Sequence, residues 1–176
     1  RVGEVAASRP PAPGSGTMSP DAPRDPAAAA DAPPPAASVL IPVRGAAGPL
    51  GNCLDALLAG RLPAEGLEIL VAGPPEDGSL TAAVAERARR LPTGCSLRWL
   101  DNPGGNTPAG LNRALAAARA AVVLRLDAHA LPAPDYVSAC LRALVESGAG
   151  CVGGALRGRG QEPWGQAVAL AWQGPM

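Results

Sequence analysis

Short apolar runs alternate with segments of helical hydrophobic spacing along most of this chain. The runs are rich in Val, Ile and Leu and lie at residues 38–43, 67–71, 96–100, 122–126 and 151–156. Between them, apolar residues recur every three or four positions, the spacing of one helix face. Strands that alternate with helices of about a dozen residues form a mainly parallel sheet with right-handed crossovers. The sequence therefore predicts an α/β fold of Rossmann type, with helices flanking the sheet.

Capping residues set the expected helix starts. Ser79 is expected to cap a helix that runs to about residue 91, and Thr107 is expected to cap the next one, with Pro108 at its first position. Two more helices are predicted at residues 134–147 and 163–172.

Residues 1–37 differ in composition from the rest of the chain. They hold nine of the 21 prolines and almost no large apolar side chains. Such a segment cannot bury enough surface to offset the entropy cost of ordering, so we expect a disordered leader before a domain at residues 38–176. The chain starts at Arg1 and stops at Met176 within an apolar segment, which indicates a fragment of a longer protein.

The charges exclude some classes of partner. Fifteen arginines balance fifteen acidic residues and Lys is absent, so the basic field of a nucleic-acid binder is missing and no nucleic-acid partner is expected. No run approaches the roughly 18 apolar residues that span a bilayer, so a cytoplasmic location is expected. The cysteines are too far apart for a CxxC metal site, which favours buried reduced thiols. They are Cys53, Cys95, Cys140 and Cys151.

Residues 122–126 lead directly into Asp127-Ala128-His129. We expect a buried strand, and because side chains alternate along a strand, Asp127 and His129 would project on the same side. A carboxylate and an imidazole there could hold a divalent cation against a diphosphate, with the imidazole favouring Mn²⁺ over Mg²⁺. The alternative is that Asp127 caps a turn while His129 packs. These residues alone leave both interpretations open.

Several loops would meet Asp127 at one edge of the sheet, where α/β folds bind ligands. They are residues 44–48, 72–78 and 103–106. Gly104 and Gly105 precede a helix, whose first amides could bind an anion, although turn formation alone accounts for them. Asp77 fits an ordinary aspartate turn. Asn112, expected to be buried behind the glycine loop, would brace that loop or contact a ligand.

Five motifs follow one another in a characteristic order. They are SVLIPVR, LEILV with a DGS turn, DNPGGNTPAGLNRAL, VVLRLDAHA with PDYV, and CVGGALRG. Together they resemble the inverting family 2 glycosyltransferases, particularly the succinoglycan-biosynthesis type, in which Asp-Ala-His replaces the usual Asp-x-Asp. The resemblance implies a GT-A-like fold, a nucleotide-diphospho-sugar donor, a glycan or lipid-linked acceptor, and a divalent metal, Mn²⁺ or Mg²⁺.

The resemblance also implies roles for individual residues. Asp127 would approach the ribose and the metal-bound diphosphate, and Asp127 and His129 would hold the metal. The other expected donor-site positions are Pro42, Val43 and Arg44 in the nucleoside pocket, Gly104, Gly105 and Asn112 on the donor floor, and Gly153-Gly154 beside the acceptor.

The chain departs from the family pattern at several positions. Gly45 and Ala46 replace a common Asn-Glu, and Ala72 replaces the aspartate that holds the base, for which Asp77 is the candidate substitute. In the family the catalytic base lies well beyond Asp-x-Asp, which here means beyond Met176.

We therefore expect the full-length parent to transfer sugar, at the inner face of a membrane if that further sequence supplies an anchor. The present stretch alone is expected to bind donor weakly or not at all. A non-catalytic nucleotide-sugar-binding domain and a sugar nucleotidyltransferase are the rival interpretations.

Overall fold

The computed structural model of the chain describes residues 33–155, 157–158, 160 and 162–173. Most of the expected leader, residues 1–32, therefore lies outside the described residues. The strands are β1 (Ala37–Pro42), β2 (Leu67–Gly73), β3 (Ser96–Asp101) and β4 (Val123–Arg125). The helices are α1 (Ala47–Leu58), α2 (Gly78–Ala88), α3 (Thr107–Ala117), α4 (Tyr136–Ser147) and α5 (Pro163–Gln173).

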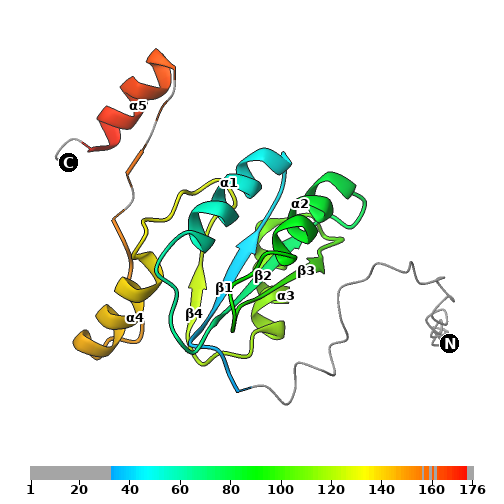
Figure 1. The fold of residues 1–176 in the computed structure, drawn as a ribbon. Helices are drawn as coiled ribbons and strands as arrows, with labels where there is room; N and C mark the ends of the chain where they lie inside the picture. Colours follow the sequence, from blue (N-terminus) through cyan, green and yellow to red (C-terminus); the bar gives the residue numbers. More distant parts are fainter. Residues whose placement is uncertain (1–32, 156, 159, 161, 174–176) are drawn as a thin grey trace, which may run out of the picture. The chain divides into compact units, whose positions relative to one another are not determined.

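The four strands form one parallel sheet in the order β3-β2-β1-β4 (Figure 1). Leu40 of β1 is paired with Leu70 of β2 on one side and with Arg125 of β4 on the other. This arrangement confirms the predicted α/β fold with a mainly parallel sheet and flanking helices.

Both faces of the central strands are covered by helices. Val39, Ile41 and Val71 pack in one cluster with the apolar sides of α1 and α2. Leu40 and Leu70 pack with Ala114 of α3 in a second cluster. Helix α3 lies on the other side of the sheet from α1 and α2 (Figure 1). Burial on both faces explains why β1 and β2 are almost continuously apolar.

The strand in front of Asp127 differs from the prediction. β4 has only three residues and pairs with β1 alone among the described strands, so Val123 is 43 % exposed instead of buried. The predicted strand at residues 151–156 is also wrong, because residues 151–155 form no strand; Leu156 lies outside the described residues. Gly153 and Gly154 interrupt this segment, and glycine weakens strands because it brings high chain entropy and no packing side chain.

The capping residues of α2 and α3 also differ from the prediction. Asp77, not Ser79, caps α2: its Oδ1 accepts hydrogen bonds from the amides of Ser79 (3.1 Å) and Leu80 (3.2 Å). Asn106, not Thr107, caps α3 by accepting from the amide of Ala109 (2.8 Å). In both loops a carboxylate or amide oxygen reaches the exposed amides of the first helical turn.

The cysteines are free thiols with very different exposure. Cys53 is fully buried, Cys95 and Cys140 are half-buried, and Cys151 is exposed, so the expected burial does not extend to Cys151. Within the described ranges, no helix has the length and apolarity needed to cross a bilayer.

Candidate functional site

A cavity of about 240 Å³ opens where the C-terminal ends of β1 and β4 lie side by side. Its walls are Pro42, Arg44, Thr107, Arg125, Asp127, Ala128 and His129. The strand order explains this position. The chain adds β2 and β3 on one side of β1 and then returns to place β4 on the other side. Such a reversal leaves a crevice at the carboxyl ends of the two strands, where open α/β sheets bind ligands.

Asp127 and His129 both line this cavity, although not from a strand. β4 ends at Arg125, and residues 127–130 form a turn in which the amide of Ala130 donates to the carbonyl of Asp127 (2.9 Å). The predicted strand alternation is therefore wrong for this pair. His129 is exposed, so it does not pack in the core as the alternative interpretation required.

Arg125 contacts the carboxylate of Asp127. Its Nε and Nη2 donate to Oδ1 at 3.2 and 3.1 Å. With Arg44 on the same wall, the cavity has two guanidinium groups beside one carboxylate and one imidazole. Guanidinium groups bind phosphate oxygens well because their donors form a planar fork.

The backbone on either side of Leu126 is held from α1 and α4. The Cys53 thiol donates to the carbonyl of Asp127 (3.5 Å), and the Tyr136 hydroxyl donates to the carbonyl of Arg125 (3.1 Å). Burial, together with the charge of Asp127, raises the pKa of Cys53 to about 11. Burial and the neighbouring Cys140 also raise the pKa of Tyr136. Both groups therefore remain protonated donors at neutral pH.

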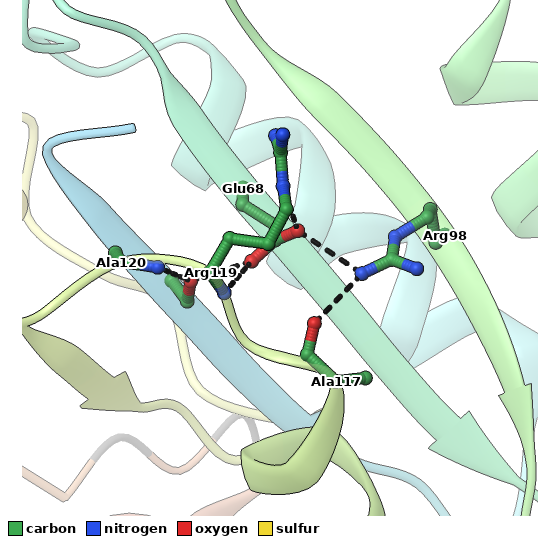
Figure 2. A network of polar contacts seen from close by, with 6 residues as sticks. Glu68, Arg98, Ala117, Arg119 and Ala120 are labelled. Atoms are coloured by element: carbon green, nitrogen blue, oxygen red, sulfur yellow. Dashed lines mark hydrogen bonds and ion pairs between the residues drawn. The ribbon is translucent and has the colours of Figure 1, made fainter. Parts of the chain in front are cut away.

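A buried carboxylate fixes the other end of β4 (Figure 2). Glu68 of β2 is fully buried and accepts hydrogen bonds from the Ser38 hydroxyl (2.6 Å), the Arg119 amide (2.9 Å) and Nη2 of Arg98 (3.0 Å). Arg98 also donates to the Ala117 carbonyl (2.9 Å). The network thus ties the connection between α3 and β4 to the sheet.

Glu68 remains charged despite its burial. Burial acts to raise its pKa, but hydrogen bonds from Ser38 and Arg119 and the charge of Arg98 lower it from its ordinary value of 4.5. The satisfied carboxylate therefore provides a fixed point for the segment that leads into β4 and the cavity.

The other predicted site residues do not line the cavity. Val43 is buried and donates its amide to the Ala72 carbonyl (2.9 Å). Hydrogen bonds lower the pKa of Asp77, and the hydrogen bond from the Ser79 hydroxyl has the largest effect. This is expected for a capping carboxylate. Gly104 and Gly105 lie in the turn before α3, where Gly105 has a φ of +60°.

Asn112 is exposed, so its predicted burial is wrong. The buried amide of this region is Asn102, which is 2 % exposed and donates to the Asn106 carbonyl (3.0 Å). Its Oδ1 has no hydrogen-bond partner among the described residues. The sequence signal was its place between an apolar strand and a glycine turn.

Arg125 and Thr107 line the cavity but were not among the predicted site residues. Arg125 lies two positions before Asp127, the spacing that often places two side chains on one side of an extended segment. Thr107 is the first residue of α3, and the N-terminus of this helix lies at the same edge of the sheet. Both positions could therefore have been inferred from the sequence.

The cavity residues suit a shared metal better than a closed metal centre. Within the described residues, no three His, Cys, Asp or Glu side chains gather into a possible metal group. Asp127 and His129 supply at most two protein ligands, which leaves other positions for phosphate oxygens or water. A carboxylate with an imidazole fits Mn²⁺ or a similar ion delivered with a diphosphate.

A second hollow, about 310 Å³, lies between α1 and α2. Its polar wall is closed by the ion pair of Arg87 with Asp55 (2.7 Å). The charges there are already paired, which makes the cavity beside Asp127 the better candidate.

Comparisons with known proteins bear on the family and the fold of the chain. The family model described as "Glycosyl transferase family 2" matches residues 38–174. TarS 1-349 of S. aureus is a similar solved structure, with a TM-score of 0.56 and 16% sequence identity over 72% of this chain. The match covers 40% of the TarS chain, so the present chain spans less than half of it. A search of curated proteins gave no match.

Proposed function

The chain belongs to glycosyl transferase family 2, and we propose that its cavity binds the diphosphate of a nucleotide-diphospho-sugar for transfer of the sugar to a glycan or lipid-linked acceptor. The observation that supports this most directly is the composition of the cavity at the chain reversal. Arg44, Arg125 and Thr107 provide donors for phosphate oxygens, and Asp127 and His129 provide metal ligands.

In this proposal Asp127 and His129 hold a divalent cation, which supplies charge stabilisation for the departing nucleoside diphosphate. Pro42 and Arg44 border the nucleoside side of the cavity. Val43, Asp77, Gly104 and Gly105 act indirectly, because they shape the loops around the cavity without lining it. Asn112 is exposed on α3 and is assigned no contact with the donor.

Inverting transfer also requires a base that deprotonates the acceptor hydroxyl. We assign no described residue to that step. The proposal therefore assigns donor binding to the domain at residues 38–176.

Calorimetric titration of the full-length protein with UDP- and GDP-sugars, with and without Mn²⁺, tests the proposal. We expect binding of one donor class that depends on Mn²⁺, and loss of this dependence in Asp127→Ala and His129→Ala. Arg142→Gln, an exposed substitution on α4, serves as the control. Absence of metal-dependent donor binding would contradict the proposal.

Turnover assays separate the rival functions. Sugar transfer or donor hydrolysis supports a transferase, whereas metal-dependent binding without turnover supports a binding domain. Release of pyrophosphate from a nucleoside triphosphate and a sugar 1-phosphate would instead identify a nucleotidyltransferase.

A further inference from the structure

Arg125 and Asp127 form an ion pair on the cavity wall. Nε and Nη2 of Arg125 both donate to the same carboxylate oxygen, Oδ1. The second oxygen, Oδ2, takes part in neither contact. The side chains are 61 % and 44 % exposed. The proposed metal ligand therefore already has a cationic partner in the free protein.

This ion pair is easily exchanged. Exposed pairs of this kind contribute little to stability, because water screens the charges and two side chains must be ordered. A divalent cation between a carboxylate and a diphosphate is a stronger local charge than one guanidinium. The cation can therefore displace Arg125 from Asp127.

The backbone of Arg125 is fixed, whereas its side chain is 61 % exposed. Arg125 pairs with Leu40 across the β1–β4 ladder, and the Arg125 carbonyl accepts a hydrogen bond from the Tyr136 hydroxyl. A displaced guanidinium therefore remains beside the cavity. No described carboxylate other than that of Asp127 lines this cavity. A diphosphate is the ligand that would satisfy its donors there.

We propose that Arg125 neutralises Asp127 in the free protein. When the metal and donor bind together, the guanidinium of Arg125 moves from Asp127 to the donor diphosphate and binds it there. This inference rests on the proposed function. It makes Arg125 a phosphate-binding residue that also couples the two ligands: it lowers the affinity for metal alone and raises the affinity for the nucleotide with metal.

Mn²⁺ binding followed by electron paramagnetic resonance tests the first half of this coupling without any activity measurement. In the full-length protein, Arg125→Gln is expected to bind Mn²⁺ alone about 3-fold more tightly, because about 0.7 kcal/mol of competition is removed. Asp127→Ala defines the background, and Arg142→Gln is the matched control. Unchanged or weaker Mn²⁺ binding by Arg125→Gln would overturn the proposal.

Titration with UDP, and with GDP in parallel, in the presence of Mn²⁺ tests the second half. Arg125→Gln should weaken binding of the preferred nucleotide about 10-fold or more, and Arg125→Lys should recover part of the loss, because it keeps the charge without the fork. Unchanged nucleotide affinity in Arg125→Gln would overturn this inference alone. Absence of Mn²⁺-dependent binding by the unsubstituted protein would overturn the proposed function as well.

Discussion

The thiol of Cys53 in α1 donates a hydrogen bond to the backbone carbonyl of Asp127 over 3.5 Å. The two residues are 74 positions apart, and the contact lies on the buried side of the turn that carries the cavity. The backbone of Asp127 is therefore held by the core, while its carboxylate lines the cavity and pairs there with Arg125.

This environment should make Cys53 the least reactive thiol of the domain. Because its pKa is raised to about 11, only about one molecule in a thousand carries the thiolate at pH 8, and the thiolate is the reactive form. Timed labelling of the native protein with iodoacetamide, read by mass spectrometry, should modify exposed Cys151 first and Cys53 last. In urea the two should react at similar rates; rapid native labelling of Cys53 would contradict its described burial.

Glu68→Gln should destabilise the fold by about 2–3 kcal/mol. Breaking a buried ion pair typically costs 3–5 kcal/mol, and this estimate is lower because Arg98 and Arg119 are 31 % and 28 % exposed. The matched control is Glu146→Gln at an exposed position of α4, where the carboxylate lies 4.0 Å from Arg142. This control should change stability by less than about 0.5 kcal/mol. Urea unfolding followed by circular dichroism measures both; equal effects would contradict a stabilising role for the network.

The contribution of Glu68 should also depend on pH in a defined direction. Its pKa is lower in the folded protein than its ordinary value of 4.5, so the unfolded chain takes up the proton first as the pH falls. The stabilisation is complete above that value and is lost as the pH falls through the folded pKa. The stability difference between the unsubstituted protein and Glu68→Gln should therefore narrow below about pH 4.5; a constant difference down to pH 3 would argue against this linkage.

Glycine at position 66 should be required by both its conformation and its neighbour. Gly66 has a φ of +86°, and an added Cβ would meet the backbone of Gly94. Gly148 has a similar φ of +62° but open space around it. We expect Gly148→Ala to cost about 1 kcal/mol from the left-handed conformation alone, and Gly66→Ala to cost more than about 2 kcal/mol. Thermal unfolding measures the contrast; equal losses would mean that the chain yields at Gly94.

The sheet could be predicted from the sequence because β1 and β2 are buried on both faces, which leaves a continuous apolar pattern in the chain. β4 was misjudged because its apolar run is the same whether a strand lies inside or at the edge of a sheet. That distinction depends on whether residues 151–155 add a further strand, and they do not. Strand order is a property of long-range pairing, which local hydrophobicity does not encode.

The site was predictable to a similar extent. Pro42, Arg44, Asp127 and His129 could be placed at one edge because strand ends show in the sequence, and these four do line one cavity. Asn112 was misplaced because helical burial depends on which face of α3 meets the sheet, and Ala114 occupies that face. The pairing of Arg125 with Asp127 depends on side-chain conformation, which spacing alone cannot supply.

Thr107 offers a test that separates helix capping from ligand binding. Because Asn106 caps α3, Thr107→Val should leave the helix intact and change stability by less than about 0.5 kcal/mol, whereas Asn106→Ala should cost about 1 kcal/mol.

If the Thr107 hydroxyl binds the donor diphosphate, as its place on the cavity wall suggests, Thr107→Val should weaken Mn²⁺-dependent nucleotide binding about 5-fold, the equivalent of one hydrogen bond. Thr107→Ser should restore it, since the hydroxyl returns without the methyl group. Calorimetry on the folded variants measures these affinities; an unchanged affinity in Thr107→Val would remove Thr107 from the donor site while leaving the metal ligands untouched.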